Sequence, residues 1–420
     1  MVVGNGSENR ALAESDVMEI IEKGTPSRLI DGKKVLVLTP DTTRTAPLPM
    51  MIRIINEVIG SRADQLDFMV ALGTHKLLTE EEILGLYGIN QTEREEVYKK
   101  SSFFNHCWDR ADTFVRIGRI QAREIEAITG GLFNEGIDIE INRRIYDYDL
   151  IVVLGTVFPH EVAGFSGGYK YLFPGISGGD FIHFFHWLSA VQTCIKTIGK
   201  KDTPVRRVLN SAADFVDVKC HCISMVVKSE KELAGLFVGT PAESWSSAAD
   251  LSSCIHIVYK DRPYSLVLGK APLMYDELWT AGKVMYKLER VVADGGTLIM
   301  FGKHIDTISH TWGRYIKKIG YHVRDYFLFQ MERFKNIPKG VLAHSTHVKG
   351  LGTYENGNEV PRIDVILATS IPEDICRKIN LGYMNPDEID IDEYKNREDE
   401  GILFVDNAGE ILYRLKGDTT

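Results

Sequence analysis

Three short runs of unbroken apolar residues constrain the fold of this chain more than any other feature. They span residues 34–39 (KVLVLT), 67–72 (DFMVAL) and 149–154 (DLIVVL), and each is followed by polar or turn-forming residues. Continuous apolar runs of this length, rather than alternating ones, are typical of parallel strands covered on both faces. The sequence therefore predicts buried strands of a parallel sheet.

Helical stretches separate these runs. Residues 49–59 carry apolar side chains at helical spacing, and residues 79–87 begin with Thr79 followed by three glutamates, a pattern typical of a capped helix start. Alternation of strands and helices predicts an α/β fold with right-handed crossovers.

The second half of the chain repeats this pattern with its own apolar runs. Strands are predicted at 264–268, 297–301 and 362–368, with a helix at 278–293 that ends at Gly295-Gly296. The tail, residues 401–415, predicts two strands in a closing hairpin around Asn407-Ala408-Gly409.

We therefore expect an α/β protein of two domains, residues 1–265 and 266–420. Each domain is expected to hold a largely parallel sheet flanked by helices, with the active site in the cleft between them.

Composition narrows the class of protein. Apolar residues make up 44% and charged residues 25% of the 420 residues, as in ordinary globular proteins. A net charge of −9 argues against nucleic acid or an anionic membrane as the main partner. No apolar run approaches the roughly 18–20 residues that span a bilayer, and the start lacks the pattern of a signal peptide. Six cysteines without a framework spacing favour a reducing, cytoplasmic location.

Polar residues with catalytic capability follow all three N-terminal runs. Asp41-Thr42-Thr43-Arg44 comes after the first, His75 after the second and His160 after the third. In parallel sheets the working residues lie just past the carboxyl ends of strands. Any one of these loops could simply form a turn, but together they predict a site.

The densest glycine cluster of the chain lies between residues 159 and 186. It holds six of the 37 glycines, with Lys170 among them. Glycines permit positive φ and close approach, and successive backbone N–H groups can bind an anion. The spacing matches neither nucleotide-binding fingerprint, so by itself the segment could equally be a turn that packs two elements together.

Histidines are the natural candidates for proton transfer here. A free imidazole has a pKa of about 6.5, and two of them on opposite sides of one carbon would suit a racemase or epimerase. Arg44 offers a planar fork for a carboxylate or phosphate. His106, His183 and the Cys220-His221-Cys222 segment fit structural roles, because no zinc-ligand pattern is completed.

Taken together, these segments resemble the nickel-dependent lactate racemase family. The matching pieces are Asp41-Thr42-Thr43-Arg44, Leu72-Gly73-Thr74-His75, Asn105-His106 and the segment from Pro159-His160 through Lys170 to His186. Order and spacing are kept, with ten residues from His160 to Lys170 and sixteen from Lys170 to His186.

The resemblance implies a role for each matching residue. Lys170 would attach a nickel-pincer nucleotide covalently, and His186 would be the protein ligand to nickel. His75 and His160 would be the acid/base pair, while Asp41, Thr42, Thr43 and Arg44 would contact the cofactor. Arg44, Thr280 and Lys283 would contact the substrate. Cofactor-biosynthesis proteins would then be partners, in addition to a small 2-hydroxy acid substrate.

The implied reaction inverts C2 of a 2-hydroxy acid by hydride transfer to the cofactor, through a 2-keto acid. Thr280 stands where the family has a glutamine and Trp279 where the lactate enzymes have a tyrosine. These changes concern the substrate pocket and favour a substrate other than lactate, such as a sugar acid.

Other functions remain open from the sequence. Lactate racemase proper and a non-catalytic carrier of the cofactor are the nearest alternatives. A nucleotide-dependent dehydrogenase lacks its glycine fingerprint here, and a zinc hydrolase lacks its ligand set. A carrier would need neither His75 nor His160.

Overall fold

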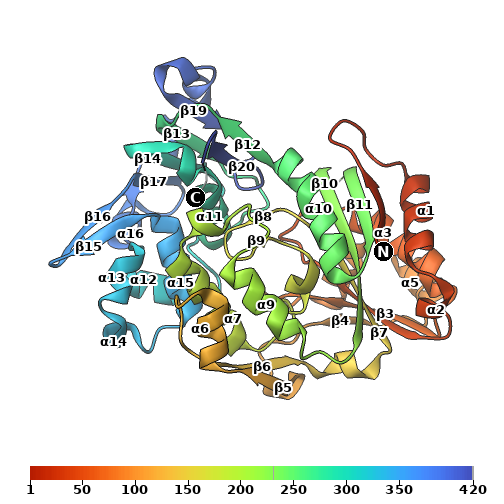
Figure 1. The fold of residues 1–420 in the computed structure, drawn as a ribbon. Helices are drawn as coiled ribbons and strands as arrows, with labels where there is room; N and C mark the ends of the chain where they lie inside the picture. The colour runs from red at the N-terminus through yellow and green to blue at the C-terminus, as the bar shows by residue number, and fades with distance from the viewer. Residues whose placement is uncertain (230, 419–420) are drawn as a thin grey trace. The chain divides into compact units, whose positions relative to one another are not determined.

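The computed structural model describes residues 1–229 and 231–418, which divide into two compact units (Figure 1). Unit 1 comprises Met1–Phe158, Phe165–Ile182 and Lys201–Ile255. Unit 2 comprises Pro159–Gly164, His183–Lys200 and the chain from His256 onward. The chain thus passes between the units several times. The domain boundary at residue 265 stays a prediction.

Unit 1 is built on a seven-stranded sheet with the order β1-β11-β10-β7-β2-β3-β4 among the described residues. The inner strands β10, β7, β2 and β3 and the edge strand β4 run parallel. Strand β11 is antiparallel to β10, and β1 is antiparallel to β11, so β1 runs in the same direction as β10. The strands are β1 (Val3–Gly6), β2 (Lys34–Thr39), β3 (Gln65–Val70), β4 (Phe103–Asn105), β7 (Leu150–Thr156), β10 (Lys219–Ser229) and β11 (Glu232–Gly239). The predicted runs at 34–39, 67–72 and 149–154 are confirmed as β2, β3 and β7.

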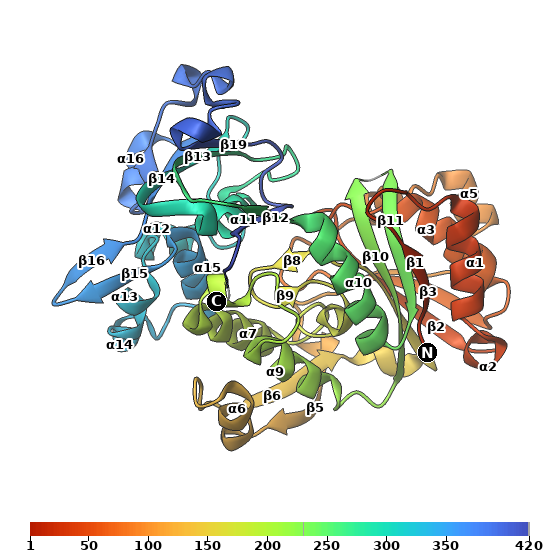
Figure 2. The ribbon, with the colours of Figure 1, turned by 45° about the horizontal axis from the view of Figure 1, so that its top comes forward.

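Burial on both faces explains the unbroken apolar runs. Every residue of β7 is buried, as is all of β2 after Lys34. Helices α1 and α3 pack their apolar side chains against alternate residues of these strands in one core. Helices α9 and α10 lie on the other side of the sheet (Figure 2).

The helices of unit 1 follow the predicted pattern. Helix α4 begins where predicted, because Thr79 Oγ1 accepts the N–H of Glu82 and the Glu82 carboxylate accepts the N–H of Thr79. Helix α3 continues as a π-helical turn, η1, which completes the predicted 49–59 helix. The helical elements are α1 (Glu14–Gly24), α2 (Ser27–Ile30), α3 (Leu48–Ile55), η1 (Asn56–Gly60), α4 (Glu80–Tyr87), α5 (Gln91–Glu96), η2 (Ala111–Thr113), α6 (Ala122–Thr129), η3 (Arg143–Asp147), η4 (Gly168–Tyr171), α9 (Pro204–Ala213) and α10 (Pro241–His256).

Two short ribbons accompany the main sheet. An antiparallel pair joins β5 (Phe114–Ile120) to β6 (Ile137–Asn142). A smaller pair joins β8 (Pro159–His160) to β9 (Gly164–Phe165), at the start of the glycine-rich segment. Helix α7 (Gly179–Gln192) begins within that segment. The division between the units falls inside this helix, after Ile182.

Unit 2 holds a five-stranded, all-parallel sheet with the order β18-β17-β14-β13-β19 in the described chain. Its strands are β13 (Tyr264–Lys270), β14 (Val292–Gly302), β17 (Asp364–Thr369), β18 (Gly382–Tyr383) and β19 (Ile402–Val405). The strands predicted at 264–268, 297–301 and 362–368 are confirmed. Gly295-Gly296 lies inside β14 rather than ending a helix; the helix ends earlier, at Leu288.

The predicted hairpin at 401–415 is wrong. Its two strands form, as β19 and β20 (Leu412–Leu415), but they do not pair with each other. Strand β19 pairs in parallel with β13, and β20 pairs in parallel with β12 (Ile257–Lys260). Each strand therefore has a long-range partner that local turn residues cannot reveal.

Further helices and one ribbon complete unit 2. Strands β15 (Gly352–Glu355) and β16 (Asn358–Pro361) form an antiparallel hairpin. The helical elements are α8 (Cys194–Thr197), α11 (Leu278–Leu288), η5 (Glu289–Val291), α12 (Gly313–Ile319), α13 (Arg324–Leu328), α14 (Met331–Phe334), α15 (Lys339–Lys349), α16 (Glu373–Lys378), η6 (Pro386–Glu388), η7 (Ile391–Tyr394) and η8 (Glu398–Glu400). Among the described helices, none is long and apolar enough to cross a membrane.

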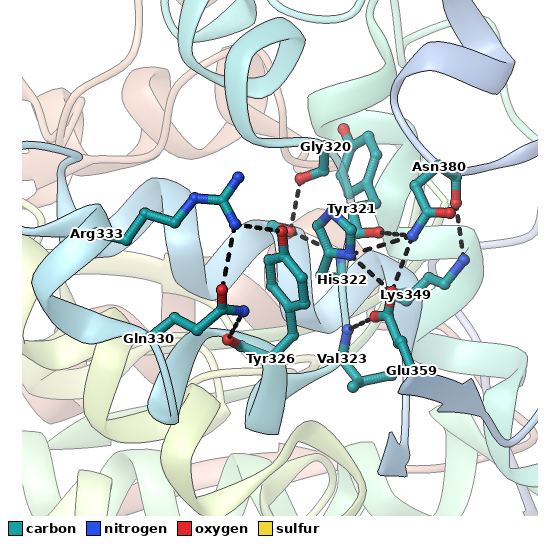
Figure 3. Close-up of polar contacts among 11 residues, drawn as sticks. Gly320, Tyr321, His322, Val323, Tyr326, Gln330, Arg333, Lys349, Glu359 and Asn380 are labelled. Carbon is teal, nitrogen blue, oxygen red and sulfur yellow. Dashed lines mark hydrogen bonds and ion pairs between the residues drawn. The ribbon is translucent and has the colours of Figure 1, made fainter. Parts of the chain in front are cut away.

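A polar cluster ties the β15–β16 hairpin to the helices of unit 2 (Figure 3). The carboxylate of Glu359 accepts the N–H of Val323 at 2.6 Å, and it contacts His322 Nδ1 at 2.7 Å and Asn380 Nδ2 at 3.1 Å. The ring of His322 stacks on Tyr326, with centroids 3.7 Å apart. Burial raises the pKa of Glu359, but its hydrogen bonds from His322 and Val323 outweigh this and leave the pKa lowered.

This cluster predicts an effect of Glu359→Gln on stability. Glutamine lacks the negative charge that the donors His322, Val323 and Asn380 face. Its substitution should therefore lower the free energy of unfolding by about 1–3 kcal/mol at pH 7. The pKa of Glu359 in the folded protein is below its ordinary value of 4.5. The carboxylate therefore contributes its full stabilisation above pH 4.5, and this stabilisation is lost as the pH falls through the folded-state pKa.

Urea unfolding of wild type and variant at pH 7 and at acid pH measures this difference. Glu373→Gln is the control, because Glu373 is half exposed and forms a surface pair with Arg377. A wild-type-to-variant gap that widens at acid pH would contradict the assignment.

Candidate active site

The carboxyl ends of three neighbouring strands meet in unit 1. Strand β2 lies between β7 and β3 and is parallel to both. The loops that leave these strands carry Asp41 to Arg44 after β2, His75 after β3, and Thr156 at the end of β7. The sheet therefore brings together residues that are more than a hundred positions apart in the chain.

Asp41 and His75 form the central polar contact of this edge. Asp41 is buried, with 5% of its surface exposed, and its Oδ2 contacts Nδ1 of His75. Its Oδ1 accepts the N–H of Thr43 at 3.1 Å and the Thr43 hydroxyl at 2.7 Å. Burial alone would raise the pKa of Asp41, but His75, Thr43 and the charge of Arg44 hold it well below its usual range. Asp41 is therefore ionised and can only accept hydrogen bonds.

Tyr171 adds a buried phenol to the same group of residues. Burial raises its pKa, while Arg44 and contacts with Thr156 act in the opposite direction and Asp41 adds to the rise. Its ring packs on Gly155 of β7, where a Cβ would lie 2.2 Å from Cε2 of Tyr171. The glycine thus makes room for the aromatic ring at the sheet edge.

Trp245 of α10 packs against the glycine-rich segment in unit 1. The indole donates to Ser166 O at 2.8 Å, and the Ser166 hydroxyl donates to Thr156 O at 2.8 Å. Gly167 and Gly168 have φ of +83° and +59° and pass close over the Trp245 side chain. Positive φ and close approach both require glycine at these two positions.

Lys170 follows these glycines within the short helix η4 and is half-buried. The carbonyl of Lys170 accepts the N–H of Gly175 at 3.0 Å, and the carbonyl of Gly175 accepts the N–H of Gly73 at 2.9 Å. The segment that carries Lys170 is thereby joined to the loop that carries His75. Thr42 is exposed beside them, on the loop that holds Asp41.

His160 belongs to unit 2 and is buried, with 4% of its surface exposed. Its Nδ1 accepts the backbone N–H of Val162 at 3.1 Å and that of Ala163 at 3.4 Å. The flanking carbonyl of Pro159 accepts a hydrogen bond from Lys287 at 2.6 Å. Glu161, next in the chain, lies with Oε2 at 3.5 Å from the same ring nitrogen.

His186 lies on α7 in unit 2 and is half-buried. Gly340 of α15 passes close to this helix, since a Cβ there would lie 2.9 Å from His183 Nδ1 and 4.0 Å from His186 Cβ. Burial lowers the pKa of the nearby His344 well below the ordinary value, and the charges of His347 and His186 act in the same direction.

The predicted substrate residues lie on α11 of unit 2. Thr280 and Lys283 are half-buried, and the Lys283 ammonium lies 4.5 Å from the ring centre of Tyr275. Trp279 stacks on His344 with centroids 3.8 Å apart and an interplanar angle of 25°. His344 is itself held by the hydroxyls of Tyr286, at 2.8 Å, and Tyr321, at 3.3 Å.

The histidines and cysteines that we expect to be structural have contacts within unit 1. His106 is fully buried with Nδ1 at 3.1 Å from Asn142 Nδ2, and burial lowers its pKa to about 4. His221 contacts Gly24 O at 2.9 Å, and Cys222 contacts the Ser224 hydroxyl at 3.3 Å. Across the described residues, no group of three or more His, Cys, Asp or Glu side chains could hold a metal ion.

Sequence patterns did not identify three residues of these sites. The indole of Trp108 donates to the carbonyl of His75 at 2.7 Å, and Tyr171 and His344 take the places described above. Tyr171 could have been suspected from its position beside Lys170. Trp108 follows the Asn105-His106 segment by two residues, but its partner lies in the loop of His75. His344 stands in a segment without a motif, and only folding brings it to its partners.

Part of the chain is similar in sequence to known proteins. Residues 8–197 match the model of the lactate racemase N-terminal domain. The curated lactate racemase of Thermoanaerobacterium thermosaccharolyticum is 25% identical over 287 residues, which cover 66% of this chain. That of Lactiplantibacillus plantarum is 24% identical over 295 residues, or 68% of this chain. The matched region spans 62% of the length of each relative.

Solved structures agree along nearly the whole chain. A crystal structure of a Thermotoga maritima protein is 32% identical and superposes with a TM-score of 0.89, covering 98% of this chain and 100% of that one. The lactate racemase apoprotein of T. thermosaccharolyticum superposes with a TM-score of 0.72 at 18% identity, covering 96% and 93%, and shows the shared fold.

Sheet and site together define an α/β protein with polar groups gathered at the carboxyl edge of a parallel sheet. Within that class, residues 8–197 belong to the lactate racemase N-terminal domain family, and the chain is similar to the curated lactate racemases over about two thirds of its length.

The packing of Tyr171 on Gly155 predicts the effect of Gly155→Ala. The new methyl group would overlap the ring, so the free energy of unfolding should fall by about 1–3 kcal/mol. Gly85→Ala on α4 is the matched control, because a Cβ there meets nothing within 4 Å; it should stabilise the helix by roughly 0.5–1 kcal/mol. Urea unfolding measures both variants. Unchanged stability of Gly155→Ala would show that the Tyr171 ring is not held against β7.

Proposed function

We propose that this chain is a racemase or epimerase that inverts C2 of a 2-hydroxy acid. The observation that carries the proposal is the group of Asp41, Arg44 and His75 at the carboxyl edge of the sheet, in a chain that matches the lactate racemase N-terminal domain over residues 8–197. An imidazole backed by an ionised carboxylate can exchange a hydroxyl proton, and a guanidinium can hold a carboxylate.

The substrate that we propose is a 2-hydroxy acid other than lactate. Trp279 and Thr280 stand where the lactate enzymes have a tyrosine and a glutamine. The indole is larger than a phenol and is fixed by its stack on His344, while threonine is shorter than glutamine. Such a change of shape and polarity favours a longer or polyhydroxylated acid, such as a sugar acid. Lactate itself is the alternative.

The cofactor that we propose is the family's nickel-pincer nucleotide, attached through Lys170 and bound to nickel by His186. The residues fit such a group: Lys170 is a half-buried amine beside glycines with positive φ, and His186 is a half-buried imidazole. Imidazole is a suitable ligand for Ni(II). Glycines of the segment and the loop from Asp41 to Arg44 would hold the nucleotide. When bound, the group supplies an acceptor for the C2 hydride.

The protein's own side chains would then position the substrate and exchange its proton. Arg44 and Lys283 hold the carboxylate, and His75 and His160 serve the hydroxyl oxygen. An imidazole would take the hydroxyl proton, and the bound cofactor would supply the acceptor for the C2 hydride, so that the substrate becomes a 2-keto acid. An imidazole would also return a proton to oxygen when C2 is reduced on its opposite face, which inverts C2.

A non-catalytic carrier of the cofactor is the second candidate. It would need Lys170 and His186 but no proton exchange. The buried Asp41 carboxylate, paired with His75 and reinforced by Thr43, favours the enzyme, because a carrier has no use for such a pair. Screening enantiopure 2-hydroxy acids for loss of optical purity decides between the two, since a carrier would scramble none of them.

Attachment of the cofactor predicts a mass change at Lys170. Protein made in a host that contains the cofactor-biosynthesis proteins should carry a covalent addition, and Lys170→Ala should lack it. Lys196→Ala on α8 is the control, because Lys196 is an exposed lysine outside the glycine-rich segment. Intact-mass spectrometry reads all three proteins. A fully active but unmodified wild type would remove Lys170 from its proposed role.

Hydride transfer predicts that C2 keeps its own hydrogen. In deuterated water, a loaded and active preparation should convert one enantiomer into the other with little deuterium at C2, because a hydride does not exchange with solvent as an acidic proton does. Mass spectrometry or proton NMR of the product measures this. Nearly complete deuteration at C2 would point to proton abstraction instead.

A further inference from the structure

A cavity of about 310 Å³ lies within unit 2, and residues of α7, α8, η5, α13 and α15 line it. This volume is at the lower end of the range of small-molecule sites in proteins. Among the described residues that line it, none is one to which the resemblance assigns cofactor or substrate. A ligand of the cavity would therefore be bound by residues that take no part in the proposed reaction.

Three cationic side chains lie on the solvent side of the cavity. Lys196 is exposed, and Arg290 and Arg324 are half-buried. Arg290 pairs with the carboxylate of Asp418, and Arg324 pairs with that of Asp325. The open side of the cavity therefore presents cations whose charge is only partly balanced, and it favours an anionic group of a ligand.

Arg324 keeps donors for such a group. Its Nε and Nη2 face the carboxylate of Asp325 at 2.8 Å, and its Nη1 donates to the carbonyl of Val191 at 3.0 Å. These contacts use three of the five N–H groups of a guanidinium and hold its plane in a fixed orientation. The other two N–H groups, with the ammonium of Lys196, can bind a carboxylate.

The inner wall of the cavity is polar but buried. Glu289 and His347 are 2% and 5% exposed. Burial raises the pKa of Glu289, although the N–H of Leu351, which Oε1 accepts at 2.8 Å, and the charges of Arg362 and Arg290 act in the opposite direction. The one acidic side chain of the lining is therefore more easily protonated than a surface carboxylate, which lowers its repulsion of an anion.

His347 gives this wall an unsatisfied polar group. Its Nε2 is buried and has no hydrogen-bond partner among the described residues. Burial lowers the pKa of His347 to about 4, against the opposing charge of Glu161, so the ring is neutral at pH 7. A neutral imidazole has one N–H and one lone pair, and a hydroxyl group can bind either of them, because it both donates and accepts. A ligand hydroxyl would thus satisfy a group that is costly to leave without a partner.

Apolar side chains complete the lining. Ala190, Cys194 and Ile195 are all buried. The turn between Ala190 and Cys194 has a defined shape, because Thr193 adopts a φ of +77°, which a β-branched residue rarely does. Residues held in such conformations cluster at ligand sites. The lining therefore suits a ligand with a short apolar stem.

We propose that this cavity binds a short-chain hydroxy acid whose carboxylate lies against Lys196 and Arg324 and whose hydroxyl lies against His347. The two groups stand at opposite ends of the ligand, because the cations are on the open side and the imidazole is on the buried side. A 2-hydroxy acid, in contrast, carries them on neighbouring carbons. The proposal goes beyond the proposed function and does not rest on it.

The first arm of the test uses methyl NMR of the full-length chain and needs neither cofactor nor activity. Isoleucine δ1 methyl groups are labelled with ¹³C, and Ile195→Val assigns the signal of Ile195, which lines the cavity. The probe is 4-hydroxybutyrate, which should shift this signal and saturate at millimolar concentration. Uncharged 4-hydroxybutanamide should leave it in place. A signal that 4-hydroxybutyrate does not move, or that both compounds move equally, would overturn the proposal.

The second arm removes the cations and follows the same signal. Lys196→Gln should raise the Kd of 4-hydroxybutyrate by about two- to threefold, and adding Arg324→Gln should raise it at least about tenfold. Lys335→Gln is the matched control, because Lys335 is an exposed lysine of unit 2 that pairs with Glu332 outside the cavity lining. An unchanged Kd in both cation variants would contradict the carboxylate site.

The third arm tests the hydroxyl contact. Butyrate lacks the hydroxyl and should bind the wild type about three- to tenfold more weakly than 4-hydroxybutyrate. His347→Phe should remove this difference, because phenylalanine keeps the ring that packs on Tyr286 but has no nitrogen. Equal binding of the two acids to the wild type would overturn the contact with His347. A protein that racemises nothing would defeat the proposed function and leave all three arms unaffected.

Discussion

The parallel register of β7, β2 and β3 is the constraint on which the site of unit 1 depends. Because the three strands are neighbours with the same direction, their carboxyl ends form one edge. Residues that leave these strands are brought within hydrogen-bonding reach although the chain separates them widely, as Asp41 and His75 show. Burial of the strands on both faces holds the edge in place, since any shift would expose apolar side chains or unpaired backbone groups.

The electrostatics at the carboxyl edge of these strands depend on one buried charge, the carboxylate of Asp41. A carboxylate as enclosed as Asp41 would ordinarily take up a proton, yet its donors outweigh the cost of burial. The same charge contributes to the high pKa of the Tyr171 phenol, while Arg44 opposes that effect. In unit 2 the equivalent support comes from the backbone, because the amides after His160 bind its ring. Nδ1 of His75 thereby meets a carboxylate, and Nδ1 of His160 meets backbone N–H groups.

Much of the architecture could be predicted from local patterns. Apolar runs identified β2, β3, β7, β13, β14 and β17, because burial on both faces leaves a continuous record in sequence. The pairing of the tail could not be read in this way. Strands β19 and β20 were expected, but their parallel partners lie far away in the chain, and the turn residues between them suggested a hairpin. The pair Gly295-Gly296 follows a helical pattern and so predicted the end of a helix, although it lies within β14.

For the site, the sequence by itself determined which residue types follow each strand, the order and spacing of the glycine-rich segment, and so the family. Those properties are local, since backbone freedom at Gly167 and Gly168 and the polarity of strand ends are written residue by residue. Only the tertiary structure decided what each side chain faces. A carboxylate against His75, two amides against His160 and a histidine beneath Trp279 all depend on long-range packing or on the exact turn of the backbone. Hydrogen-bond polarity, and with it the chemistry available to each imidazole, is a property of those contacts and not of the residue type.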